Sequence, residues 1–186
     1  GVLTADGPED QLAVRPDGVF ARRLTRIPEA EARRTAEWKP RGTVLITGGT
    51  GALGGHVARL LAARGAAHLV LAGRRGPAAE GAAELTAELE ALGARVTVAA
   101  CDVADRDALA RLLAELTGPD AAHPLTAVVH TAGTDTPGLL ADTDPAAFGA
   151  VLAAKAAGAV HLDALLRELP GGHELDAFVL FSSIAG

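Results

Sequence analysis

The feature that most constrains this chain is a glycine-rich segment between an apolar run and a helical pattern. Residues 43–47 read Thr-Val-Leu-Ile-Thr, and glycines follow at positions 48, 49, 51 and 54. From Ala52 to Ala63 the alanines and leucines have helical spacing. Glycine lets a backbone approach a diphosphate closely, and a helix N-terminus presents unpaired N–H groups and a positive dipole. The segment therefore predicts a dinucleotide-binding turn, with a purely structural strand-to-helix turn as the alternative.

The rest of the chain alternates between strand and helix patterns. We expect strands at 43–47, 68–72, 95–100, 126–130 and 177–181, and helices at 52–63, 79–92, 106–116 and 145–169. Short strands that are apolar throughout are typical of a parallel sheet covered on both faces. The helices supply right-handed crossovers between such strands. The sequence therefore predicts an α/β fold with a doubly wound parallel sheet over residues 43–186.

Residues 1–42 have a different pattern. Two short strands, 11–14 and 19–24, are expected around the turn Arg15-Pro16-Asp17-Gly18, and 29–38 is compatible with a helix. Two strands do not make a stable sheet alone. We therefore expect this β segment to be the end of something larger together with a linker, or an arm that docks on the main domain.

Composition excludes several classes of protein. The net charge of −6 argues against a broad nucleic-acid-binding face. No stretch has the 18 or so uninterrupted apolar residues of a membrane helix, and the N-terminus lacks a signal pattern. The single cysteine, Cys101, cannot form an internal disulfide, and we expect it to be buried in a reducing compartment. These features favour a cytoplasmic protein, and no metal site is expected.

In an open parallel sheet, ligands bind beyond the carboxyl ends of the strands, so the residues that follow each strand are candidate ligands. After the second strand come Arg74 and Arg75. Guanidinium groups make bidentate bonds to phosphate, which favours a 2′-phosphate and hence NADPH, although a solvated basic loop has the same sequence. After the third strand, Asp102 could accept from an adenine amino group while Val103 packs on the ring. Alternatively Asp102 or Asp105 caps the next helix, which the sequence taken alone favours.

The last two strand ends are less specific. His130 is expected to be a packed, hydrogen-bonded residue rather than a catalytic one, and small residues follow it to Gly133. Ser182 and Ser183 could hydrogen-bond a substrate carbonyl or simply end a strand. Lys155, on an alanine-rich helix, is by itself most simply a solvent-facing residue.

Together these motifs resemble the short-chain dehydrogenase/reductase superfamily and, more narrowly, the ketoreductase domains of modular type I polyketide synthases. The resemblance covers residues 43–186, in the family's order and spacing. It is carried by Thr47-Gly48-Gly49-Thr50-Gly51-Ala52-Leu53-Gly54, Gly73-Arg74-Arg75-Gly76, Cys101-Asp102-Val103-Ala104-Asp105, His130-Thr131-Ala132-Gly133, Lys155-Ala156-Ala157-Gly158-Ala159 and Phe181-Ser182-Ser183.

The resemblance implies a Rossmann-like, NADPH-dependent enzyme that reduces the β-keto group of a polyketide intermediate held on an acyl carrier protein, alongside other domains of the same multifunctional synthase. It implies catalytic roles for Lys155 and Ser183. The expected cofactor-binding residues are Thr47, Gly48, Thr50, Gly51, Ala52, Leu53, Arg74, Arg75, Asp102, Val103, Thr131, Ala132, Gly133 and Lys155. Residues 1–42 are similar to the end of the structural subdomain that precedes the catalytic one.

Two departures from the family pattern affect these expectations. The family's proton donor is a tyrosine beyond the serine, and this sequence has no tyrosine. We therefore expect the chain to be truncated and inactive alone. Asp135-Thr136-Pro137 stands where ketoreductases that give the D-hydroxyl carry Leu-Asp-Asp, which suggests the A-type, L-hydroxyl outcome. An inactive structural ketoreductase domain and a free-standing reductase of a small ketone remain the alternatives.

Overall fold

The computed structural model describes residues 9, 11–26, 28, 38–134, 142, 144–169 and 174–182. The chain divides into two compact units, Gly1–Glu37 and Trp38–Gly186. In the first unit, β1 (Leu12–Arg15) and β2 (Gly18–Ala21) form an antiparallel hairpin with Leu12 opposite Ala21. The predicted hairpin is therefore confirmed, although Arg15 and Gly18 of the expected turn pair with each other in the strands and the second strand ends at Ala21 rather than at residue 24. Most of the helix expected at 29–38 lies outside the described residues.

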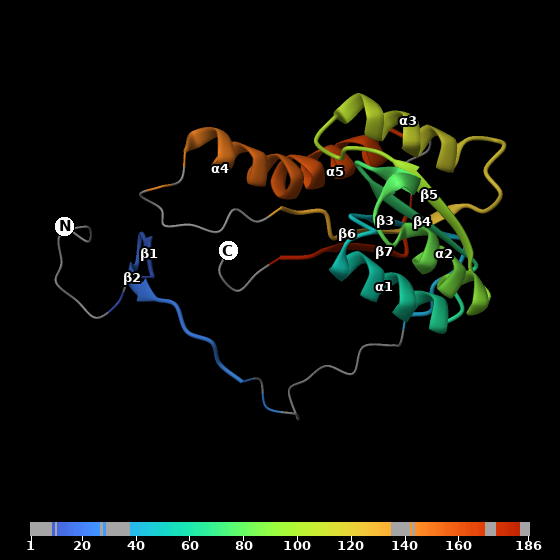
Figure 1. Cartoon of the computed structure of the whole chain (residues 1–186). Coiled ribbons are helices and arrows are strands. Elements are labelled where there is room, and N and C mark those ends of the chain that lie inside the picture. Colours follow the sequence, from blue (N-terminus) through green and yellow to red (C-terminus); the bar gives the residue numbers. More distant parts are fainter. Residues whose placement is uncertain are drawn as a thin grey trace. The chain divides into compact units, whose positions relative to one another are not determined.

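The second unit is a five-stranded parallel sheet in the order β5-β4-β3-β6-β7 (Figure 1). The strands are β3 (Thr43–Thr47), β4 (His68–Gly73), β5 (Arg95–Ala100), β6 (Leu125–His130) and β7 (Ala177–Leu180). The order runs outward from β3 in both directions, first through β4 and β5 and then through β6 and β7. The predicted doubly wound sheet is therefore confirmed, and its switch point lies between β3 and β6.

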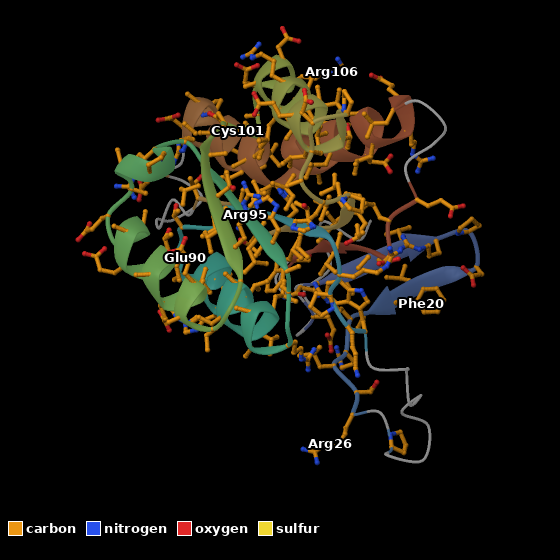
Figure 2. All side chains as sticks on the ribbon, turned by 90° about the vertical axis from the view of Figure 1, so that its right-hand side faces the viewer. Phe20, Arg26, Glu90, Arg95, Cys101 and Arg106 are labelled. Atoms are coloured by element: carbon orange, nitrogen blue, oxygen red, sulfur yellow. The ribbon has the colours of Figure 1, made fainter. Side chains whose placement is uncertain are left out.

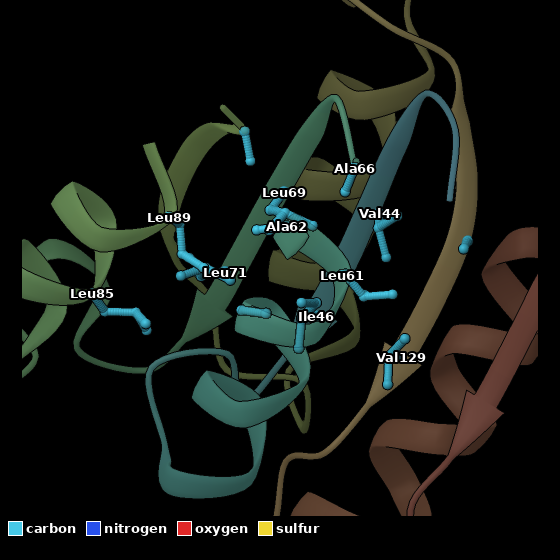
Figure 3. Packing of buried hydrophobic residues seen from close by; sticks show 13 residues of the cluster. Val44, Ile46, Leu61, Ala62, Ala66, Leu69, Leu71, Leu85, Leu89 and Val129 are labelled. Carbon is cyan, nitrogen blue, oxygen red and sulfur yellow. The ribbon is translucent and has the colours of Figure 1, made fainter. Parts of the chain in front are cut away.

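The helices cover both faces of this sheet (Figure 2). They are α1 (Ala52–Ala63), α2 (Ala82–Ala91), α3 (Arg106–Thr117), α4 (Pro145–Leu152) and α5 (Gly158–Glu168). Residues of α1 and α2 pack on one face with Val44 and Ile46, and residues of α3 and α5 pack on the other with Leu45. Figure 3 shows the first of these clusters, in which Leu61 of α1 and Leu89 of α2 meet side chains of β3 and β4.

The central strands explain why the sheet forms. All five residues of β3 and five of the six residues of β4 are buried, alternating between the two faces. Full burial of an aliphatic side chain contributes about 1.5–3 kcal/mol, so a polar replacement in either strand would oppose the fold. The edge strands β5 and β7 are more exposed.

Two expected helices differ from those observed. The helix expected at 79–92 begins at Ala82, because the preceding Gly81 has a left-handed φ of 73° and a 3-10 turn occupies Gly76–Ala78. The helix expected at 145–169 is interrupted by a π-helical turn, Ala153–Ala157, between α4 and α5.

By length and composition, Pro145–Glu168 could cross a membrane. Its second half instead buries Leu162, Leu165 and Leu166 in the second core cluster.

Candidate functional site

A cavity of about 1000 Å³ opens at the carboxyl ends of β3, β4, β5 and β6. The switch point of a doubly wound sheet is where such a crevice is expected. The residues that line it come from the ends of these four strands, from the first turn of α1, from α4 and from the start of the turn that follows α4. They are Gly48, Thr50, Gly51, Ala52, Leu53, Gly54, Ala72, Gly73, Arg74, Arg75, Cys101, Asp102, Val103, Ala104, Thr131, Ala132, Gly133, Thr134, Ala150, Ala153 and Ala154.

The glycine-rich turn brings the start of α1 against two neighbouring strands. Gly48 has a φ of 68°, and a Cβ there would lie 2.8 Å from the backbone of Ala132. A Cβ at Gly54 would lie 2.2 Å from the carbonyl oxygen of Gly48. The N–H of Gly51 donates to that same oxygen at 2.9 Å. Glycine is therefore required at both positions for the turn to pack on the helix and on the loop after β6.

The N-terminus of α1 has the properties of an anion site. The N-cap of this helix is Gly51, which has no side chain that could accept from the first amides, and the first turn contains no acidic residue. The amides of Ala52, Leu53 and Gly54 have no partner within the helix because they belong to its first turn, and all three residues line the cavity. These amides and the positive end of the helix dipole fit the diphosphate of a dinucleotide.

Arg74 and Arg75 line the same cavity from the turn after β4. Both are exposed, and neither forms an ion pair with a carboxylate of the described residues. At Gly73, which precedes them, a Cβ would lie 3.3 Å from the hydroxyl of Thr50, so this loop lies against the glycine-rich turn. The structure thus brings two guanidinium groups to the crevice that holds the helix N-terminus.

The two aspartates after β5 have different roles. The Asp105 carboxylate accepts from the N–H groups of Asp107 and Ala108 at 3.0 Å, so it is the N-cap of α3, and these bonds lower its pKa. Among the hydrogen bonds of the described residues, the Asp102 carboxylate accepts only one, from the N–H of Ala104 at 3.0 Å. Asp102 also lines the cavity. The capping alternative is therefore confirmed for Asp105 and not for Asp102. Val103 also lines the cavity but is 96% buried, with 4% of its surface exposed.

Cys101 is buried as predicted. Burial raises the pKa of its thiol, and the nearby carboxylates of Asp102 and Asp105 raise it further. The thiol is therefore held in its neutral form, which is a poor nucleophile.

His130 at the end of β6 is buried and hydrogen-bonded, as predicted. Its Nδ1 lies 2.7 Å from the hydroxyl of Thr47, and its Nε2 lies 3.1 Å from the carbonyl oxygen of Lys155. Burial lowers the pKa of the ring, although the carbonyls of Lys155 and Ala154 raise it. Beside it, Thr131 donates to the carbonyl oxygen of Thr47 from its hydroxyl at 2.7 Å and from its N–H at 3.0 Å.

Lys155 lies at the edge of this crevice. It is exposed, as a solvent-facing lysine would be, but its methylene groups cross Gly133, where a Cβ would lie 2.8 Å from its Cε. Ala153 and Ala154 of the same π turn line the cavity. Ser183 and Asp135-Thr136-Pro137 lie outside the described residues.

The described part of the chain holds no group of three or more His, Cys, Asp or Glu residues able to bind a metal. Two features escaped the sequence reasoning: the π turn around Lys155 and the hydrogen bond from His130 to its backbone. An alanine-rich helix gives no sequence signal for a π turn. The hydrogen bond joins residues 25 positions apart that only the fold brings together.

Comparison with known proteins gives consistent matches. The family model described as the KR domain matches residues 42–186. Pikromycin polyketide synthase component PikAIII of Streptomyces venezuelae is 56% identical over 178 residues, which are 96% of this chain and 11% of that protein. A solved A1-type ketoreductase is 53% identical with a TM-score of 0.77, covering 100% of this chain and 38% of that one. PlmKR1, a ketoreductase from the first module of phoslactomycin biosynthesis in Streptomyces sp. HK803, is 47% identical with a TM-score of 0.81, covering 96% and 40%.

Proposed function

The chain belongs to the KR domain family of modular polyketide synthases, and from this premise we propose that it forms the cofactor-binding part of a ketoreductase. The proposed reaction is the NADPH-dependent reduction of the β-keto group of an acyl chain held on an acyl carrier protein. One observation supports the proposal most strongly. The N-terminus of α1, Arg74 and Arg75 all lie in one crevice at the switch point of the sheet, and Lys155 lies at the edge of that crevice. Because the chain spans 11% of the synthase component it matches, the reaction, the carrier protein and the neighbouring synthase domains are proposed for the whole protein.

The residues of the crevice suit each part of the cofactor. The amides of Ala52 and Leu53 would hold the diphosphate, and Arg74 and Arg75 would bind the 2′-phosphate. Asp102 would accept from the adenine amino group. When bound, the reduced nicotinamide supplies the hydride for carbonyl reduction.

Lys155 and Ser183 would act at the reacting carbonyl. The hydroxyl of Ser183 would orient the carbonyl oxygen by donating to it. The ammonium group of Lys155 would lower the pKa of a nearby phenol, because a positive charge favours the phenolate. The sequence has no tyrosine, so in this proposal the proton donor is supplied by a residue outside these 186.

The proposed stereochemical outcome is A-type, the L-hydroxyl. It is supported by Asp135-Thr136-Pro137 in place of Leu-Asp-Asp and by the similarity to a ketoreductase described as A1-type. Chiral chromatography of the reduced product tests it, and a D-hydroxyl product would contradict it.

The function is tested in the complete domain that carries this chain, by cofactor binding and by turnover of a β-ketoacyl thioester. We expect NADPH to bind more tightly than NADH. Arg74→Ala and Arg75→Ala should each weaken NADPH binding about 10- to 150-fold, the value of one charged hydrogen bond, and leave NADH binding unchanged. Arg111→Ala, an exposed arginine of α3 outside the cavity, is the matched control.

Turnover distinguishes the reductase from an inactive structural domain. Lys155→Ala should reduce thioester reduction about 10²- to 10⁴-fold, because a phenol whose pKa is not lowered is a weak proton donor at neutral pH. Lys39→Ala, the other lysine of the sequence, should leave it unchanged. Tight NADPH binding without any reduction by the unmutated domain would favour the structural alternative. Equal affinity for NADPH and NADH would contradict the proposal itself.

A further inference from the structure

His130 is a buried titratable residue that the cofactor argument does not use. It is 97% buried, with 3% of its surface exposed. The carbonyl oxygen of Lys155 can only accept, so Nε2 must carry the ring proton and donate it at 3.1 Å. Nδ1 then accepts from the hydroxyl of Thr47 at 2.7 Å. Both nitrogens of a neutral ring are satisfied in this way, and the lowered pKa of His130 agrees with a neutral ring.

The carbonyl that His130 binds belongs to an unusual segment. Lys155 is the central residue of the π turn Ala153–Ala157, and after this turn the N–H of Gly158 donates to the carbonyl oxygen of Ala153, five residues back. Such turns are rare, occur mostly as single turns inside α-helices, and are frequent at functional sites. An extra residue in one turn rotates the side chains that follow by roughly 100° relative to a regular helix of 3.6 residues per turn. The direction of the Lys155 side chain therefore depends on where the π turn forms.

The packing around His130 leaves little room for another arrangement. A Cβ at Gly158 would lie 3.0 Å from Cε1 of His130 and 2.8 Å from Cγ2 of Val103. Gly158, the first residue of α5, therefore lies closer to the His130 ring than a residue with a Cβ could. The Lys155 side chain, from the same turn, crosses Gly133.

We propose that His130 is a positioning residue that fixes the π turn and so directs Lys155 across Gly133 to the edge of the cofactor crevice. The other hydrogen bond of the ring ties this arrangement to Thr47, the last residue before the glycine-rich turn. One imidazole therefore holds both the segment that would bind the diphosphate and the segment that carries the lysine. The catalytic consequence rests on the proposed reductase function, whereas the structural consequence does not.

Two substitutions separate the two hydrogen bonds in the complete domain. In His130→Gln, the longer amide can still donate to the Lys155 carbonyl. In His130→Asn, the shorter amide can still accept from Thr47 but does not reach Lys155. We expect His130→Asn to lower kcat at least tenfold, and His130→Gln to regain most of the loss. Gly158→Ala leaves the His130 ring intact but adds a methyl group that pushes the start of α5 away from it. This variant should therefore also lower kcat, as His130→Asn does.

Amide hydrogen exchange of the cofactor-free domain provides a readout that does not need activity. His130→Asn and Gly158→Ala should increase exchange in residues 153–158 while exchange in α3 stays unchanged. The control is His68→Asn, which removes part of a similarly buried histidine at the opposite ends of the strands, bonded to Thr43 and Thr97. His68→Asn should not increase exchange selectively in residues 153–158.

Each outcome decides between the proposals. Equal exchange and equal kcat for His130→Asn and the unmutated domain would overturn the role of His130. An increase in exchange spread evenly over the sheet and helices would also overturn it, because His130 would then be an ordinary packing residue. If the unmutated domain reduces no thioester while exchange changes only in residues 153–158, the inference about the π turn stands and the proposed function fails.

Discussion

Gly54 illustrates how the absence of one methyl group shapes the cofactor crevice. A Cβ there would lie 2.2 Å from the Gly48 carbonyl oxygen, and that atom is backbone that cannot rotate away. We expect Gly54→Ala to lower the free energy of unfolding by about 1–3 kcal/mol, as overpacking does. It should also abolish tight NADPH binding, because the first turn of α1 must move away from Gly48. Urea denaturation and cofactor fluorescence measure the two effects.

Gly149 of α4 is the matched control for this substitution. A Cβ there would contact nothing within 4 Å, and the position is helical. Gly149→Ala should raise the free energy of unfolding by up to about 1 kcal/mol, the difference in helix propensity between glycine and alanine. If both substitutions had the same effect on stability, close packing at Gly54 would not be the reason for its glycine.

At the scale of elements, the connection from β5 to α3 contains one aspartate with a structural role and another with a proposed binding role, within four residues of each other. Asp105 caps α3, whereas Asp102 lines the cavity. Asp105→Ala should lower the urea midpoint without changing NADPH affinity, and Asp105→Asn should restore the cap. Asp102→Ala should weaken NADPH binding about two- to tenfold, the value of one hydrogen bond, with little change in the urea midpoint. If Asp102→Ala changed only stability, its adenine contact would be refuted.

The elements that the sequence predicts well are those with a local cause. The strand at 43–47 and the helix at 52–63 have the observed bounds because the apolar run and the glycines that end it are adjacent in the sequence. The strand-end residues of the cavity were predictable for a related reason, since a parallel sheet brings its strand ends together. Ala150, Ala153 and Ala154 also line it and were not predicted, whereas the predicted Thr47 and Lys155 are not among its lining residues. The π turn was not predictable, because contacts from β6 and from the loop after β5 determine where the helix at 145–168 is interrupted.

At the scale of the molecule, the two units have different sources of stability. The hairpin of the first unit leaves Val14, Val19 and Phe20 about half exposed, at 60%, 54% and 49%. A two-stranded sheet with exposed apolar side chains is at best marginally stable. We therefore propose that residues 1–42 are the end of a structural subdomain and its linker, and that residues 43–186 belong to the catalytic subdomain.

The stability of the second unit should depend on pH through two buried histidines in the central strands. Burial lowers the pKa of His68, and the charges of Arg95 and His123 lower it further. Burial also lowers the pKa of His130. Below the ordinary pKa of 6.5 the unfolded chain binds protons that the folded chain does not, so the free energy of unfolding falls as the pH decreases. The loss should begin near pH 7 and stop below the lowered pKa values.

Urea midpoints of the complete domain between pH 8 and pH 5 measure this dependence. His68→Gln removes one titrating group, so the midpoint should fall less steeply over this range than in the unmutated domain. His56→Gln, at an exposed position of α1, should leave the slope unchanged. The opposite dependence, with the midpoint rising as the pH falls from 7 to 5, would mean that the folded domain binds these protons more readily than the unfolded chain. Burial would then not control the titration of His68 and His130.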